Sequence, residues 1–142
     1  MQTDVLRSIA VTPEPESIGQ VRKFVEDCCA DWGLEVASET AVLLASELAT
    51  NAVRYARTPV IVWLGHRSDR IVLSVEDASL ESATARDPNP LDEGGRGLLL
   101  VDALAERWGE RNVPTGKLVW AEISTTRRAV PEQPTGPDVD RG

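Results

Sequence analysis

The most informative segment of the chain is ASELATNAVRYA, residues 45–56. Successive residues of an α-helix are rotated by about 100°, so a helix over this segment aligns its apolar residues in one stripe. This stripe consists of Ala41, Leu44, Leu48, Ala52 and Tyr55. The polar side chains beside the stripe are those of Thr40, Glu47, Asn51 and Arg54. The spacing predicts an amphipathic helix with polar groups along the edge of its buried face.

Glu47 and Asn51 are the two residues of this helix that suggest chemistry. They are four positions apart, so they lie on one face, one turn from each other. A carboxylate and an amide that border an apolar stripe are costly to desolvate unless they have partners. Their oxygen atoms suit Mg²⁺, which keeps several waters and shares the phosphate oxygens of a substrate. The alternative is an ordinary polar pair on a helix surface.

Hydrophobic periodicity on either side of this helix predicts the order β-α-α-β-β-α-β-β. The expected strands are Leu6–Val11, Val60–Leu64, Ile71–Asp77, Arg107–Asn112 and Lys117–Ser124. The expected helices are Ser17–Trp32, Glu35–Ala56 and Leu98–Ala105. We therefore expect an α+β fold, a two-layer α/β sandwich with the helices on one face of a mostly antiparallel mixed sheet. Residues 1–125 form this domain, and residues 126–142 are expected to be a disordered tail.

Shorter signals refine the boundaries of these elements. Ser17 and Gln20 have the spacing of a capping box and predict the start of the first helix, and Gly33 predicts its end. His66 falls in the segment GHRSDR, residues 65–70, which we expect to be a loop between two antiparallel strands. No catalytic role is predicted for this histidine.

The composition restricts the class of protein. The 142 residues are 42% hydrophobic and 27% charged, which suits one domain with a packed core. No segment has the roughly 20 consecutive apolar residues of a membrane span, and the N-terminus lacks the pattern of a secretory signal. A net charge of -8 disfavours a protein that binds nucleic acid through its phosphates. We expect no direct binding to a membrane or to nucleic acid.

The two cysteines, Cys28 and Cys29, are neighbours and are poorly placed for a relaxed disulfide with each other. They follow the apolar spacing of the first helix, so we expect them in the core. Since His66 is the only histidine, the sequence offers no zinc spacing and no Cys–His pair for catalysis. This pattern indicates the reducing environment of the cytoplasm.

The negative charge is unevenly distributed. Residues 1–51 carry nine acidic and three basic residues, whereas residues 52–142 carry fourteen and twelve. Such an asymmetry marks either a surface for a partner or a solvated helical face.

Two features later in the chain suggest ligand binding. Asp77 ends an apolar strand, where a carboxylate either caps a turn or accepts a hydrogen bond from an amino group such as that of adenine. The segment GGRGLLLV, residues 94–101, places three glycines before the third helix. Glycines allow close backbone approach, and N–H groups at a helix N-terminus bind phosphate, although a flexible linker has the same composition. The segment matches neither the Walker nor the Rossmann pattern.

In chain order, these features resemble the GHKL, or Bergerat-fold, ATP-binding superfamily, which includes domains of gyrases, heat-shock chaperones, histidine kinases and anti-sigma factors. Glu47–Ala52 resembles its N box, Val75–Ser79 its G1 box and Gly94–Leu98 its G2 box. With RWG at 107–109 and GKLVWAE at 116–122, the short chain is most similar to the anti-sigma-factor serine/threonine kinases, particularly the small actinobacterial members.

The resemblance covers residues 5–125 and implies roles for the matching residues. Asn51 would coordinate Mg²⁺, which would bridge the ATP phosphates, and Glu47 would be the catalytic general base that acts on a protein serine. Asp77 would receive the adenine amino group. The residues that would bind the phosphates at the start of the third helix are those of the G2 box, Gly95, Arg96, Gly97 and Leu98. Residues 80–93 would form a lid over ATP.

The implied function is that of an ATP-binding anti-sigma regulatory factor. Such a protein serine kinase would phosphorylate a STAS-domain anti-sigma antagonist and control a sigma factor by partner switching. It would use ATP and Mg²⁺, and the resemblance is also compatible with a homodimer. Two alternatives stay open: a non-catalytic ATP-dependent protein-binding module, and a structural domain without nucleotide.

The chain departs from the superfamily pattern at two positions. Ser79 stands where the G1 box usually has a glycine two residues after its aspartate. Leu118 stands where many relatives carry a threonine near the adenine. Two arginines also have open roles, since Arg54 and Arg96 would contact either phosphates or solvent and surface partners.

Overall fold

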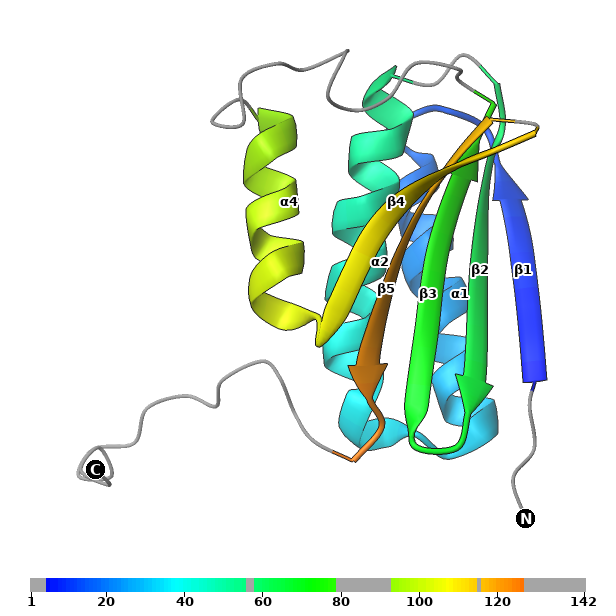
Figure 1. Cartoon of the computed structure of the whole chain (residues 1–142). Coiled ribbons are helices and arrows are strands. Elements are labelled where there is room, and N and C mark those ends of the chain that lie inside the picture. Colours follow the sequence, from blue (N-terminus) through cyan, green and yellow to red (C-terminus); the bar gives the residue numbers. More distant parts are fainter. Residues whose placement is uncertain (1–4, 56–57, 79–92, 115, 127–142) are drawn as a thin grey trace, which may run out of the picture.

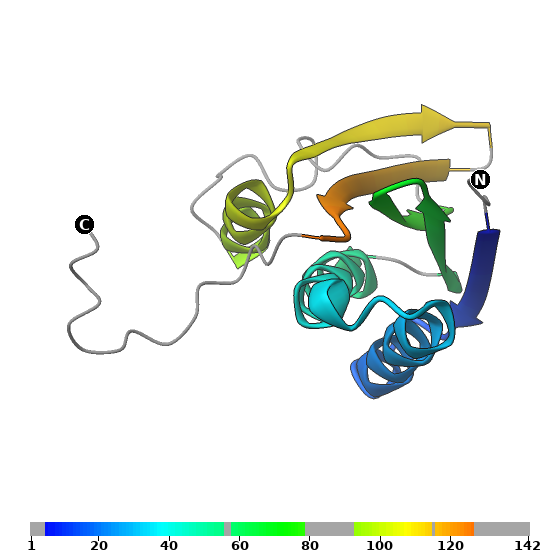
Figure 2. The ribbon, with the colours of Figure 1, turned by 90° about the horizontal axis from the view of Figure 1, so that it is seen from below.

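The computed structural model describes residues 5–55, 58–78, 93–114 and 116–126, which form two layers (Figure 1). The strands are β1 (Val5–Val11), β2 (Val60–Arg67), β3 (Arg70–Asp77), β4 (Arg107–Val113) and β5 (Gly116–Ser124). The helices are α1 (Ser17–Trp32), α2 (Glu35–Tyr55) and α4 (Glu93–Leu104). The helices lie on one face of the sheet (Figure 2). The predicted α+β class and order of elements are confirmed. Within the described ranges, no helix is long and apolar enough to cross a bilayer.

The sheet has the strand order β1-β2-β3-β5-β4, and each neighbouring pair is antiparallel. The described strands therefore form a purely antiparallel sheet, where the sequence suggested a mostly antiparallel mixed one. The central strand is β3, which is hydrogen-bonded to β2 on one side and to β5 on the other. The strand that ends in Asp77 is thus held on both edges.

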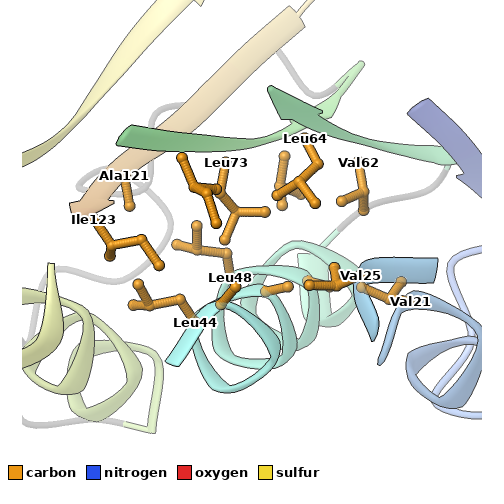
Figure 3. Close-up of a cluster of buried hydrophobic side chains, with 14 of the residues drawn as sticks. Val21, Val25, Leu44, Leu48, Val62, Leu64, Leu73, Ala121 and Ile123 are labelled. Atoms are coloured by element: carbon orange, nitrogen blue, oxygen red, sulfur yellow. The ribbon is translucent and has the colours of Figure 1, made fainter. Parts of the chain in front are cut away.

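The core lies between the sheet and the helices α1 and α2 (Figure 3). Its largest contributions come from fully buried aliphatic side chains, each worth about 1.5–3 kcal/mol. These side chains include Val21, Val25, Leu44, Val62, Leu64 and Leu73. Cys28 and Cys29 are 0% and 1% exposed and are both free thiols, which confirms their predicted place in the core.

The start of α1 differs from the capping box that the sequence suggested. Ser17 is already the first helical residue, and the N-cap position is Glu16, which makes no side-chain capping hydrogen bond. The Ser17 hydroxyl lies instead 3.0 Å from the hydroxyl of Thr12, so the capping-box prediction is wrong. The helix ends as predicted, because Gly33 adopts a left-handed φ of 69° and donates its N–H to the Ala30 carbonyl.

Two segments expected to be loops are partly regular structure. The glycine-rich segment was expected to precede a helix at Leu98, but α4 begins at Glu93, so these glycines form its first turns. The turn between β2 and β3 consists only of Ser68 and Asp69. His66 therefore lies in β2, paired with Val5 and Ile71 of the flanking strands, and not in a loop.

Candidate functional site

The ends of three elements meet at one end of the molecule (Figure 1). They are the C-terminal end of α2, the C-terminal end of β3 and the N-terminal end of α4. Each of these ends carries one of the three motifs that the sequence analysis singled out. The helix α2 lies between α1 and α4 in the helical layer, and it contacts both α4 and β3 (Figure 2). The fold therefore brings the three separate motifs to one region.

The polar edge of α2 is arranged as its helical spacing predicts. Thr40 is only 1% exposed, Glu47 and Asn51 are half-buried, and Arg54 is exposed. Since α2 rises about 5.4 Å per turn, the side chains of Glu47 and Asn51 start from positions about one turn apart on one face. The stripe beside them is buried at Ala41, Leu44, Leu48 and Ala52. The side chain of Tyr55 lies outside the described part of the structure.

Asn51 carries an unusual buried atom. Among the described residues, its Oδ1 and the Oγ1 of Thr40 are the buried side-chain oxygens that have no hydrogen-bond partner. A buried polar atom without a partner is destabilising by about 1–3 kcal/mol. An amide carbonyl oxygen is also a donor that Mg²⁺ accepts. The chemistry of Asn51 therefore fits the cation that the resemblance implies.

Asp77 is buried at the end of β3. It is 3% exposed and continues the inward alternation of Leu73 and Val75, so its side chain faces the helical layer. The preceding Glu76 faces the opposite side of the sheet, where it accepts a hydrogen bond of 3.3 Å from the indole N–H of Trp63. The burial of Asp77 fits an acceptor for a buried amino group better than a solvent-exposed turn cap.

The backbone that follows Asp77 is held from two directions. The N–H of Ala78 donates to the hydroxyl of Thr58, at 3.3 Å, which connects the end of β3 with the segment before β2. Gly116 packs directly against this backbone, because a Cβ there would lie 1.9 Å from the carbonyl oxygen of Asp77. Both contacts fix the position of Asp77. No sequence motif marks Thr58 or Gly116.

Lys117 is a second buried charged residue on the inner face of the sheet. It lies directly opposite Asp77 in the antiparallel register and is only 2% exposed. The inward alternation of Val119, Ala121 and Ile123 on β5 was the available signal, since it places Lys117 on the same face. The family resemblance instead singles out Leu118, at the position where many relatives carry a threonine. That residue occupies the outward phase of β5, opposite Glu76, so it does not face the side of Asp77.

The remaining expected site residues are described only in part. The backbone of Gly95, Arg96, Gly97 and Leu98 forms the first turns of α4, and their side chains lie outside the described part of the structure. Ser79 and nearly all of the expected lid, residues 80–93, also lie outside it. Where α4 is described, Val101 and Leu104 are buried, and Asp102 accepts a hydrogen bond of 2.8 Å from the Trp108 indole.

The cysteines and the histidine lie away from this region. His66 stacks on Trp32 with ring centroids 5.8 Å apart, and its Nε2 lies 3.1 Å from the carbonyl oxygen of Ser68. Burial raises the pKa of Cys29 to about 11 and also raises the pKa of Cys28, although the nearby Arg7 opposes the second shift. Neither thiol is therefore activated as a nucleophile.

A comparison with known protein families agrees with the geometry. The family model described as "Histidine kinase-like ATPase domain" matches residues 11–123, which is most of the chain. The matched range includes Glu47, Asn51, Asp77 and the glycine-rich start of α4. No curated protein matches the chain. ATP is thus the expected ligand of the region where the three motifs meet, and the chain belongs to the histidine kinase-like ATPase domain family.

Proposed function

We propose that this protein is an ATP-dependent serine kinase of the anti-sigma type, which phosphorylates a STAS-domain antagonist and controls a sigma factor by partner switching in the cytoplasm. The observation that carries the proposal is that the Glu47 carboxylate lies one helical turn from Asn51 on one face of α2, and that the buried Oδ1 of Asn51 has no hydrogen-bond partner in the described part of the chain. A cation ligand and a base one turn apart suit transfer of a phosphoryl group.

Each part of the region has a role in this proposal. Asp77 accepts a hydrogen bond from the adenine amino group, and the backbone at the start of α4, Gly95 to Leu98, surrounds the phosphates. Asn51 holds Mg²⁺, which neutralises charge on the phosphates when it is bound. In this arrangement the nucleobase contacts the buried Asp77 at the end of β3, and the phosphates lie nearer to the half-buried Asn51 on α2.

Glu47 acts on the protein substrate. Its carboxylate takes the proton of the attacking serine hydroxyl while the serine oxygen forms a bond to the γ-phosphorus. The bond between the γ-phosphorus and the β–γ bridging oxygen breaks, and ADP leaves with that oxygen. The half-buried position of Glu47 keeps its carboxylate within reach of a docked substrate.

The direct test is phosphorylation of candidate STAS-domain proteins with Mg-ATP, read as phosphoserine by mass spectrometry. Glu47→Gln should lower the rate at least about 100-fold while it leaves ATP affinity within about threefold, since general-base catalysis contributes about 10²–10⁴-fold. Glu39→Gln, the same substitution two turns earlier on an exposed part of α2, is the matched control and should retain the rate.

Retention of ATP binding without phosphorylation of any candidate would contradict the kinase assignment. The protein would then be the second kind of regulator, one that uses ATP to order a partner-binding surface. Equal activity of Glu47→Gln and the wild-type protein would contradict the role of Glu47 as the base.

A further inference from the structure

The C-terminal half of α4 is joined to the sheet by a hydrogen bond between two side chains. The indole N–H of Trp108 on β4 donates to the carboxylate of Asp102 on α4, at 2.8 Å. Trp108 lies opposite Ala121, a buried residue of β5, so its side chain is on the inner face of the sheet. Hydrogen bonds are directional, and those to a carboxylate are among the strong ones. This bond therefore fixes how α4 is oriented relative to the sheet.

The other contacts of α4 specify its orientation less closely. The helix packs mainly on α2, and among its described side chains Val101 and Leu104 are buried. Apolar contact is non-directional, so it holds α4 against its neighbour without setting its tilt. The chain is held again just after the helix, where the N–H of Glu106 donates to the carbonyl oxygen of Glu122 at 2.8 Å. The helix is thus anchored at its C-terminal end.

The opposite end of α4 carries the glycine-rich turns. Gly95 lies seven residues before Asp102, which is about 10 Å along the helix axis. A tilt of about 10° at Asp102 would move the backbone of Gly95 by roughly 2 Å. Hydrogen bonds tolerate much less than this, because donor and acceptor normally lie about 2.7–3.2 Å apart. The tilt of α4 therefore decides which atoms its first turns can reach.

We propose that Asp102 and Trp108 are positioning residues for the phosphates of ATP: their hydrogen bond sets the tilt of α4 and thereby aligns the backbone of residues 95–98 with the phosphates. The inference rests on the proposed function in taking the start of α4 as the phosphate-binding segment. It gives a part in nucleotide binding to two residues outside the N, G1 and G2 boxes, which act through α4 and not by contact with the nucleotide.

The test compares the affinities of Mg-ATP and adenosine, both measured by calorimetry. Trp108→Phe removes the indole N–H and keeps an aromatic ring. It should lower the affinity for Mg-ATP about tenfold, because a smaller fraction of the protein then holds α4 in the competent orientation. The affinity for adenosine should stay within about twofold, because adenosine has no phosphates.

Variants of the acceptor separate the hydrogen bond from the charge. Asp102→Ala removes the acceptor and should lower the ratio of Mg-ATP to adenosine affinity as much as Trp108→Phe does. Asp102→Asn removes the charge but keeps an oxygen for the indole N–H, so it should retain most of the ratio. Asp102→Ala with Trp108→Phe should be no weaker than either single variant, since both remove the same bond.

Trp63 offers the matched control. Its indole N–H also donates to a carboxylate, that of Glu76, at 3.3 Å, but on the opposite face of the sheet. Trp63→Phe therefore loses a bond of the same kind without a connection to α4. It should leave the ratio of Mg-ATP to adenosine affinity unchanged, and a loss equal to that of Trp108→Phe would overturn the inference.

Three further results would overturn it: an unchanged ratio in Trp108→Phe and Asp102→Ala, an equal loss for both ligands, or a loss in Asp102→Asn as large as in Asp102→Ala. If Trp108→Phe does not fold, the two Asp102 variants decide, since the side chain of Asp102 is exposed. If the wild-type protein binds no Mg-ATP, the proposed function fails together with the inference. If it binds Mg-ATP and the variants match it, only the role of this hydrogen bond fails.

Discussion

Asn51 destabilises the protein in the absence of a ligand, because its buried Oδ1 has no hydrogen-bond partner among the described residues. Asn51→Ala removes this atom and improves helix propensity, so we expect the free energy of unfolding without nucleotide to rise by about 0.5–2 kcal/mol. The same variant should lose most of the stabilisation that Mg-ATP gives. Urea denaturation with and without Mg-ATP measures both effects.

Thr40 offers the matched control for this prediction. Its Oγ1 is the other buried oxygen without a partner, and it lies on α2 about three turns before Asn51. Thr40→Val is nearly isosteric and should raise the free energy of unfolding by about 1 kcal/mol while it keeps the full effect of Mg-ATP. If Asn51→Ala lowered stability and kept the Mg-ATP effect, Asn51 would be a structural residue.

Cys28 and Cys29 should be inert in the folded protein. The thiolate is the reactive form, and burial raises the pKa of Cys29 to about 11. At pH 8 we therefore expect both thiols to react with an aromatic disulfide reagent at least about 100-fold more slowly than in the urea-unfolded chain. The contribution of the neutral Cys29 thiol to stability is present below its unfolded pKa and is lost as the pH rises through about 11. Rapid reaction of the native protein would contradict this burial.

At the scale of the elements, Gly116 holds β5 against the end of β3. A Cβ at this position would lie 1.9 Å from the carbonyl oxygen of Asp77 and 2.6 Å from the Cα of Ala78. Gly116→Ala should therefore lower the free energy of unfolding by about 1–3 kcal/mol and weaken ATP binding, because the backbone that carries Asp77 has to move.

The control for this substitution is Gly19 of α1, where a Cβ would meet nothing within 4 Å. Gly19→Ala should raise the free energy of unfolding by up to about 1 kcal/mol, because alanine favours the helix, and should leave ATP binding unchanged. Equal effects of the two substitutions would show that close approach at Gly116 has no special role. Chemical denaturation and nucleotide titration measure both variants.

The strands and helices were predictable because their periodicity is local. The alternation of β3 and the apolar stripe of α2 each place a residue on a face without reference to the rest of the chain. Contacts between different elements were not predictable in this way. The side chain of Ser17 contacts the hydroxyl of Thr12 and does not cap α1. Val5 of β1 pairs with His66, so that β2 continues through His66. The first contact depends on how the chain turns between β1 and α1, and the second joins residues far apart in the sequence.

The site was predictable to a similar extent. Glu47, Asn51 and Asp77 carry recognisable motifs, and the structure brings their elements to one end of the fold. Lys117 and Thr58 belong to no motif. Lys117 lies opposite Asp77 because of the register between β3 and β5, and Thr58, in the segment between α2 and β2, accepts a hydrogen bond from the N–H of Ala78. A charged residue in the inward phase of a strand was the one sequence signal that pointed to Lys117.

At the scale of the molecule, the acidic surface of α1 is available to a basic partner. Glu26, Asp27 and Asp31 are exposed there. Asp27 and Asp31 are paired with Lys23 at 3.4 Å and Arg7 at 2.9 Å, and exposed pairs of this kind contribute only about 0–1 kcal/mol. Their main effect is therefore on the electrostatic field of a chain whose net charge is -8.

Reversal of these three charges tests whether the surface guides a partner. Glu26→Lys, Asp27→Lys and Asp31→Lys together should slow association with the proposed STAS-domain substrate about tenfold at low salt. The effect should be much smaller at about 0.5 M salt, because dissolved ions then screen the surface charges. ATP affinity should not change, because α1 packs beside α2 on the side away from α4 (Figure 2). Unchanged association at low salt would assign the acidic residues to solvation alone.

The central claim is that α2, the end of β3 and the start of α4 form one ATP site, and calorimetric titration of the protein with Mg-ATP tests it most directly. We expect one ATP per chain, with affinity lowered at least about tenfold by Asp77→Ala and by Asn51→Ala and kept within about twofold by Thr40→Val. Absence of binding, or binding that Asp77→Ala and Asn51→Ala leave unchanged, would contradict the account.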